Sequence, residues 1–170
     1  MTTETTTTCP GCQLELPHDT SAVYTGYFNT TPECWLLFTQ ALGVEYSNVV
    51  AFARAHQLTV DTYAVQHAGG PHPDKSMDVH LCGLHCILDL KLPPAMTPRI
   101  RQQLAQSVQE WPHYPPPRHQ GSMTVRDVAD ADSIQAHIDR VKNWAVTVWD
   151  SWSDHHARIA DLVRHHVKLR

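Results

Sequence analysis

The sequence predicts a mainly α-helical fold: a bundle of about four to five helices, with a zinc-knuckle arm at residues 9–34 and one irregular extended segment. Two observations support this prediction. Apolar residues recur at helical spacing in several long stretches, and Pro and Gly interrupt the chain between them. Near the start, Cys9 and Cys12 enclose Pro-Gly, which makes a tight turn of the kind that holds a zinc ion.

Length, composition and charge limit the class of protein. With 170 residues, 42% of them hydrophobic, we expect one domain over residues 9–170 after a disordered, Thr-rich leader at residues 1–8. The net charge of −4 gives no general attraction to nucleic acid, and no apolar run approaches the ~20 residues that span a membrane. The start of the chain lacks the basic and apolar regions of a signal peptide, so we expect a cytoplasmic protein.

Histidine and cysteine are the residue types that stand out. The chain holds 13 histidines and 5 cysteines. In a reducing compartment, an odd number of cysteines that includes a CxxC pair favours metal binding or free thiols over a framework of disulfides. The sequence therefore indicates a histidine-rich, metal-binding protein, and the combination of Cys and His favours Zn²⁺.

Cys9-Pro-Gly-Cys12 is the first half of the predicted zinc site. A thioredoxin-type redox motif has the same spacing, but it needs a preceding strand and a following helix. Here threonines precede the motif and Gln-Leu-Glu-Leu-Pro follows it, so we favour metal binding over redox chemistry. Structural zinc takes four ligands, so two more must come from elsewhere in the chain.

Cys34 is the predicted third ligand. Thr31-Pro-Glu-Cys begins a helix, and Cys34 falls in its first turn, where the helix dipole favours a thiolate. The alternative is a buried apolar cysteine. The fourth ligand is expected to be a histidine: His67, at the end of the second predicted helix, is the first choice, and His80 and His18 are the alternatives.

The first four helices are predicted from their apolar spacing and from the residues that interrupt it. The first covers residues 32–42 and ends at Gly43, and the second covers residues 47–68 and ends at Gly-Gly-Pro-His-Pro. The third is expected at residues 76–90. The fourth, at residues 98–110, has only a thin apolar stripe, which places it on the outside.

The last third of the chain is expected to contain a connection and one long helix. Residues 111–130 form a Pro-rich crossover that should be extended. Within it, residues 121–128 alternate in polarity, which predicts a strand or extended lid paired with the N-terminal loop or with a second chain in a dimer. A Trp-rich apolar face predicts a helix that begins at Ser133 and continues to the end of the chain.

The second predicted helix carries a stripe of polar side chains. Helical spacing puts His56, Tyr63 and His67 on one face. His56 and His67 lie roughly 16 Å apart on such a helix, so they cannot bind one metal ion together. If the next helix packs antiparallel to this one, His80 falls near Tyr63 and His67, and His85 falls near His56.

Several functions are compatible with this stripe. One is a polar pocket for a small-molecule ligand, lined by His56, Tyr63, Gln66, His155 and His156. A second is a metal-dependent hydrolase, in which imidazoles at the level of His67 and His80 hold a catalytic ion. Its candidate catalytic residues are Asp61, Tyr63 and His80. A third is an interaction module that docks partners on its zinc arm and Pro-rich segment. Histidines that are only hydrogen-bonded in the core remain an alternative to all three.

Several short motifs run through the sequence: Cys-Pro-Gly-Cys at residues 9–12, Pro-Glu-Cys-Trp at 32–35, the stretch at 56–67, Val-His-Leu at 79–81, and Trp-x2-His-His at 152–156. Together they resemble an uncharacterised bacterial family, a domain of unknown function. The resemblance covers nearly the whole chain after residue 8. It implies a single-domain cytoplasmic bacterial protein and supplies no substrate. The signature residues that it implies are Cys9, Cys12, Cys34, His56, Asp61, Tyr63, Gln66, His67 and His80.

Overall fold

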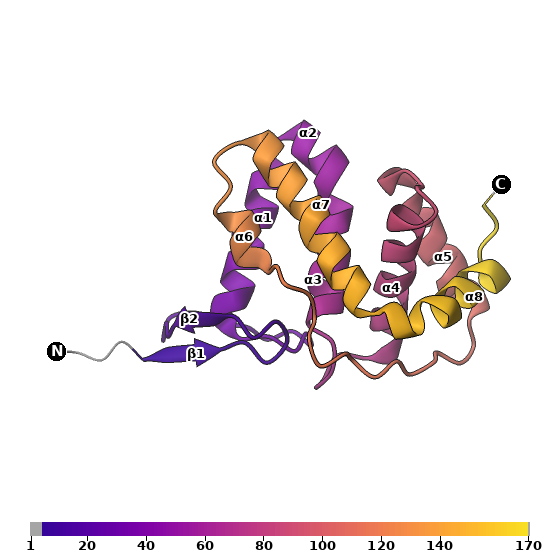
Figure 1. Cartoon of the computed structure of the whole chain (residues 1–170), viewed down its shortest axis with the longest axis horizontal. Helices are drawn as coiled ribbons and strands as arrows, with labels where there is room; N and C mark the ends of the chain where they lie inside the picture. Colours follow the sequence, from indigo (N-terminus) through magenta and orange to yellow (C-terminus); the bar gives the residue numbers. More distant parts are fainter. Residues whose placement is uncertain (1–4, 170) are drawn as a thin grey trace.

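The structure is a computed structural model that describes residues 5–169, and it is mainly helical, as the sequence predicts (Figure 1). The long helices are α1 (Pro32–Ser47), α3 (Gln57–Gln66), α4 (Asp74–Leu88), α5 (Thr97–Ser107), α7 (Ile134–Ser151) and α8 (His156–His166). Shorter elements are α2 (Val49–Ala51), the π-helical turn η1 (Phe52–His56), the 3₁₀ turns η2 (Pro94–Met96) and η3 (Ser153–His155), and α6 (Val125–Ala129). The sheet consists of β1 (Thr6–Thr8) and β2 (Glu15–Pro17).

The N-terminal arm is a β-hairpin. Strand β1 pairs antiparallel with β2, so that Thr7 lies opposite Leu16, and Leu16 is buried beside α1. The prediction of a disordered leader at residues 1–8 is wrong for Thr6–Thr8, because the tight turn after β1 brings β2 alongside to supply hydrogen bonds. Residues 1–4 of that leader lie outside the described residues.

Helix α1 begins as predicted and ends later than predicted. Thr31 is its N-cap and accepts a hydrogen bond from the backbone N–H of Cys34, and Pro32 occupies the first turn. The predicted end at Gly43 is wrong, since the helix continues to Ser47. Gly43 lies exposed on the helix surface, where it weakens the helix without ending it.

The second predicted helix is divided into α2, η1 and α3. Asn48 separates it from α1 and caps α2, accepting hydrogen bonds from two backbone N–H groups. The wider π-helical turn of η1 then leads into α3. At the far end His67 is the C-cap, and Gly69 and Gly70 take positive φ angles of 87° and 54° that turn the chain toward α4.

Helix α3 lies at the centre of the bundle. It packs against α4 and α7, and α7 crosses in front of it in Figure 1. Gly83 of α4 allows the close approach, because a Cβ atom there would lie 2.5 Å from the Asp61 carboxylate of α3. Helix α4 corresponds to the third predicted helix, at residues 76–90, with its bounds shifted to Asp74–Leu88.

The extended strand predicted at residues 121–128 is wrong, because α6 occupies Val125–Ala129. Thr124 and Asp127 form a capping box at the start of α6, in which the side chain of each residue accepts a hydrogen bond from the backbone N–H of the other. The threonine-x-x-aspartate spacing was visible in the sequence and starts a helix rather than a strand. Residues 111–123 contain no helix or strand and run below α4 and α8 in Figure 1.

The single C-terminal helix predicted from Ser133 onward is also wrong, because it breaks at Trp152. Ser133 caps α7 as expected, and the chain then turns through η3 into α8. Trp152 is fully buried at the turn, and α8 packs back against α4 and α5. The break lets Ile159 and Val163 enter the core, which a straight helix would carry past the end of the bundle.

The arrangement of the helices produces one hydrophobic core, in which Trp144, Trp152 and Tyr63 are among the largest fully buried side chains. Within residues 5–169, none of the helices has the length and apolar character needed to cross a membrane. The metal-binding candidates lie at the edge of this core, where the hairpin meets α1 and α3.

We predict that Gly83→Ala destabilises the protein by about 1–3 kcal/mol, because the Asp61 carboxylate is held by hydrogen bonds and cannot move aside for a methyl group. Gly43→Ala is the matched control. A Cβ atom at Gly43 has nothing within 4 Å, so this helical substitution should stabilise by about 0.5–1 kcal/mol. Urea unfolding measures both, and equal effects of the two substitutions would contradict the close α3–α4 contact.

Candidate metal centre

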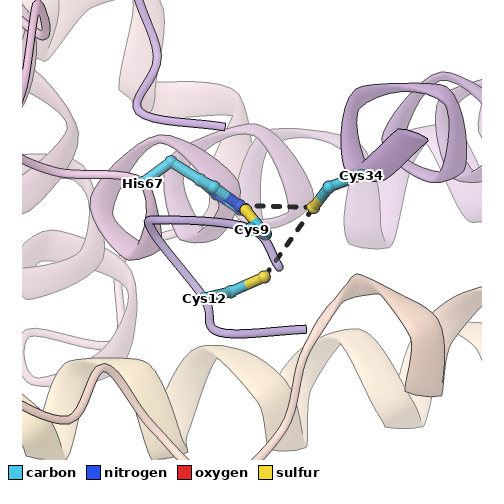
Figure 2. A group of neighbouring side chains, drawn as sticks. All are labelled: Cys9, Cys12, Cys34 and His67. Atoms are coloured by element: carbon cyan, nitrogen blue, oxygen red, sulfur yellow. Dashed lines mark hydrogen bonds between the residues drawn. The ribbon is translucent and has the colours of Figure 1, made fainter. Parts of the chain in front are cut away.

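Three cysteines and one histidine from three parts of the fold meet in what we call the metal centre (Figure 2). Cys9 and Cys12 come from the hairpin turn, Cys34 from the first turn of α1, and His67 from the end of α3. Their ligand atoms all lie within 4.8 Å of one another. Cys34 Sγ is 3.7 Å from Cys12 Sγ and 3.4 Å from His67 Nε2. These four side chains could therefore hold a metal ion.

The hairpin turn fits against the end of α3 only because residue 11 is a glycine. A Cβ atom on Gly11 would lie 2.6 Å from both the Asn29 carbonyl oxygen and the His67 ring. The turn is closed by two backbone hydrogen bonds of 2.9 Å, one from Cys9 to Leu14 and one from Gln13 back to Cys9. The Pro-Gly pair inside the motif thus has a steric role: it lets both cysteines reach the imidazole.

His67 is fixed in the tautomer that a metal ligand needs. Its Nδ1–H donates a 2.7 Å hydrogen bond to the Tyr63 carbonyl oxygen one turn earlier in α3. Nε2 then faces Cys34, and once it loses its proton to a binding cation its lone pair is directed at the metal centre. The Tyr63 ring also stacks on the imidazole, with centroids 3.9 Å apart. Helix α3 therefore orients the imidazole before any metal ion binds.

Two hydroxyl groups lie behind the sulfur atoms. Thr30 Oγ1 and Tyr63 Oη are hydrogen-bonded to each other at 2.7 Å. This hydroxyl pair contacts Cys9 Sγ at 3.6 Å through Thr30 and Cys34 Sγ at 3.7 Å through Tyr63. Burial and the neighbouring Cys34 raise the pKa of Tyr63, so its hydroxyl keeps its proton and can donate it to sulfur.

The electrostatics of the metal centre is suited to a cation. Hydrogen bonds from Cys12 and Cys34 lower the pKa of Cys9, whereas hydrogen bonding to Cys34 and Cys9 raises the pKa of Cys12. One thiol therefore ionises readily, and the next ionises only against that negative charge. Burial alone lowers the pKa of His67, but Cys34 and Cys9 outweigh it and raise that pKa to about 9. A bound cation would let all the thiols ionise together.

His80 does not join the metal centre. Its Nδ1–H donates to the Asp61 carboxylate at 2.7 Å, and Arg101 and Gln57 also hydrogen-bond to that carboxylate. The hydrogen-bond partner of His80 is therefore Asp61, and not Tyr63 or His67. Asp61 precedes Tyr63 by two residues, which places the two side chains on opposite sides of α3. Helix α4 packs on the Asp61 side, and the cysteines pack on the other.

The predicted pairing of His85 with His56 is wrong as well. His85 Nδ1–H donates instead to Asp89 at 2.8 Å, within its own helix. His56 Nδ1–H donates to Glu45 at 2.9 Å, and His137 Nε2–H donates to the same carboxylate at 3.0 Å. Sequence analysis missed Glu45 and His137. Glu45 follows the buried Phe38 and Ala41 of α1 at helical spacing, which was the available signal.

Each side chain predicted to line a ligand pocket has hydrogen-bond partners of its own in a different part of the fold. Gln66 donates to the carbonyl oxygens of Gln120 and Met123 and accepts from the Trp144 indole. His155 donates to the Pro115 carbonyl oxygen at 3.0 Å, and His156 donates to the Trp149 carbonyl oxygen at 2.9 Å. His56 pairs with Glu45, and Tyr63 belongs to the metal centre. The structure does not bring these five side chains together. His18, the other alternative ligand, pairs with Glu33.

Asp78 of α4 is a buried carboxyl group with no hydrogen-bond partner among the described residues. Burial and the negative charge of Asp74 raise its pKa to about 8, and the cation of Arg158 only partly opposes this. The folded protein therefore holds Asp78 protonated at neutral pH.

We predict that the metal centre of Gly11→Ala binds an added metal ion, with Zn²⁺ as the probe, about 10–100-fold more weakly than that of the wild type, because the added methyl group would push the turn away from the backbone of residue 29 and from His67. Competition against a chromogenic chelator measures the affinity. Gly43→Ala should bind the ion like the wild type. Equal affinities of Gly11→Ala and the wild type would show that the hairpin turn does not need to touch α3.

The protonated Asp78 should make folding stability depend on pH. Its pKa rises from 3.8 in the unfolded chain to about 8, so its contribution is complete below pH 3.8 and is lost as the pH rises toward 8. The side chain of Asp78→Asn cannot ionise. The free energy of unfolding of this variant, relative to that of the wild type, should therefore increase by about 1 kcal/mol per pH unit across this range. Urea unfolding at pH 5, 6 and 7, with saturating zinc in both proteins, measures the difference. Parallel pH profiles would contradict the prediction.

Comparison with family models supports the resemblance that the motifs predict. Residues 7–153 match a single model, described as a family of unknown function (DUF5946), and this segment includes all four residues of the metal centre. No curated protein matches the chain, and no solved structure matches it. The match covers most of the chain, so this protein belongs to the family of unknown function DUF5946.

Proposed function

We propose that this protein binds one Zn²⁺ ion through Cys9, Cys12, Cys34 and His67, and that the ion has a structural role. The observation that carries the proposal is the convergence of these four donor atoms within 4.8 Å. Three thiolates and one imidazole are a donor set that selects zinc, and Cys₃His is a frequent composition of structural zinc sites.

The distances between the donor atoms support a tetrahedral ion. With Zn–S bonds of ~2.3 Å, two sulfur ligands of a regular tetrahedron lie roughly 3.8 Å apart, and a sulfur and a nitrogen ligand lie roughly 3.6 Å apart. The separation of Cys12 Sγ and Cys34 Sγ is 3.7 Å, and that of Cys34 Sγ and His67 Nε2 is 3.4 Å. The side chains thus need little movement to coordinate the ion.

The position of the metal centre supports a structural role. It joins the hairpin, the start of α1 and the end of α3, and the hairpin itself has strands of only 3 residues each. A two-stranded sheet of that size is marginally stable in water by itself. A zinc ion would fix the hairpin to the bundle, and four protein ligands would leave no coordination position for a substrate.

A metal-dependent hydrolase on the helical histidines has less support. His80 is engaged by Asp61 and His67 faces the cysteines, so the two imidazoles serve different clusters. Within residues 5–169, the metal centre is the one group of Cys, His, Asp or Glu side chains close enough to hold an ion. The proposal also implies a reducing location such as the bacterial cytoplasm, because all three cysteines must stay reduced.

Elemental analysis of untagged protein tests the proposal. We expect about one zinc per chain in the wild type, loss of the ion in Cys12→Ser and in His67→Ala, and retention in His80→Ala, which removes a buried histidine outside the metal centre. Nickel columns must be avoided, since 13 histidines would collect nickel. Absence of metal from the wild type, or its retention in His67→Ala, would contradict the proposed site.

Chelation separates a structural ion from a catalytic one. Removal of a structural ion should lower the melting temperature, because the binding free energy contributes to folding. Removal of a catalytic ion would leave the hairpin packed on the bundle, so the melting temperature would fall only by the mass-action effect of losing a bound ligand. Thermal unfolding monitored by circular dichroism, with and without a strong chelator, distinguishes the two roles.

A further inference from the structure

The three sulfur atoms of the metal centre have different surroundings. Cys9 and Cys34 are completely buried, whereas Cys12 is partly exposed at the outer side of the hairpin turn. Of the three cysteines, Cys12 is therefore the one with solvent-exposed surface in the folded chain, and an external reagent meets this residue before the two buried ones. Solvent access alone ranks Cys12 first.

Hydrogen bonding ranks the sulfurs in the same order. The hydroxyl pair of Thr30 and Tyr63 contacts Cys9 at one end and Cys34 at the other, and it does not contact Cys12. One of the two hydroxyl protons bridges the oxygens, so the pair donates the other to Cys9 or to Cys34, and the thiolate that accepts it is stabilised and less nucleophilic. The hydrogen-bond contacts of Cys12 Sγ are the other two thiols, with Cys34 Sγ at 3.7 Å, and no hydroxyl group among the described residues donates to it. Of the three sulfur atoms, that of Cys12 is thus the one without a hydroxyl donor.

We propose that Cys12 is a modification site, at which hydroperoxides oxidise the metal centre, and that Cys34 is the resolving cysteine. The inference rests on the proposed function, since the bound ion is what holds Cys12 as a thiolate. Cys34 suits the second role because it is buried away from the peroxide and lies within 3.7 Å of the sulfur that is attacked first.

The reaction takes place in two steps. The Cys12 thiolate attacks one oxygen of hydrogen peroxide, the O–O bond breaks, and sulfenic acid and hydroxide form. The Cys34 thiolate then attacks the Cys12 sulfur, the S–O bond breaks, and a Cys12–Cys34 disulfide and a second hydroxide form. Two thiolates lose two electrons in total, and the peroxide gains them. The disulfide removes two of the four proposed zinc ligands, so the ion should be released and the hairpin freed from the bundle.

Cys82 and Cys86 provide an internal comparison within the same chain. Both are buried in α4, outside the metal centre. Burial raises the pKa of Cys82, and it raises the pKa of Cys86 to about 11. Both therefore stay protonated thiols at neutral pH and should resist oxidation under conditions that convert Cys12.

Titration of the zinc-loaded full chain with hydrogen peroxide tests the proposal. A chromogenic chelator that binds weakly reports released zinc, and peptide mapping by mass spectrometry locates the oxidised residues. We expect about one zinc released per peroxide consumed, with a Cys12–Cys34 disulfide. A 1,3-dione added during the reaction should trap sulfenic acid on Cys12. A Cys9–Cys12 disulfide, first oxidation at Cys9 or at Cys34, or oxidation of Cys82 and Cys86 before Cys12, overturns the proposal.

Two variants that retain all four proposed ligands test the shielding by the hydroxyl pair. Thr30→Val and Tyr63→Phe remove one hydroxyl each, and a brief treatment with N-ethylmaleimide then measures the reactivity of each sulfur. Alkylation of Cys9 or Cys34 should rise relative to Cys12. The double variant Cys82→Ala, Cys86→Ala should match the wild type. Unchanged alkylation of Cys9 and Cys34 relative to Cys12 in both hydroxyl variants overturns the shielding by the hydroxyl pair.

The outcomes separate this proposal from the zinc site itself. Metal content is measured before any peroxide is added. A wild-type protein that carries no zinc overturns the proposed function and this inference with it. A zinc-loaded protein that is oxidised first at Cys9 overturns only the inference about Cys12.

Discussion

The main physical constraint on the structure is electrostatic. Three thiols and an imidazole lie within 4.8 Å of one another, and their charges must be balanced. Adjacent thiolates repel, which is why the pKa of Cys9 is lowered while that of Cys12 is raised. A cation removes the conflict, because each thiolate then faces a positive charge. In the proposed zinc-bound state, the same cation would also attach the hairpin to the bundle.

Helix α3 connects this centre to the rest of the fold by presenting different chemistry on its two sides. Tyr63 and His67 face the cysteines, and Asp61 faces α4. Glycine allows close approach on both sides, Gly11 from the hairpin and Gly83 from α4. Several of the histidines that make the composition unusual pair with carboxylates or carbonyl oxygens near them in the fold. Five of the 13 histidines are buried, so the histidine richness is divided between the core and the surface.

Features that depend on nearby residues were predictable from the sequence. The N-cap at Thr31, the turn inside Cys9-Pro-Gly-Cys12 and the Ser133 cap follow from local backbone chemistry. The end of helix α1, the helix at Val125–Ala129 and the break at Trp152 were missed. In the first case the exposed Gly43 was given too much weight, in the second a capping box went unrecognised, and in the third burial of Trp152 decided the direction of the chain.

The sequence by itself determined the class of fold and the cysteine and histidine donors from which a metal centre could be built, because helical periodicity and CxxC spacing are local properties. Only the tertiary structure decided that His67, and not His80, meets the cysteines. The physical reason is that the hairpin and helix α4 pack on different sides of α3. Contacts between residues far apart in the sequence, such as Gly83 against Asp61, determine which side each one takes. It also decided that Cys12 alone is partly exposed, since exposure depends on everything that packs around a residue.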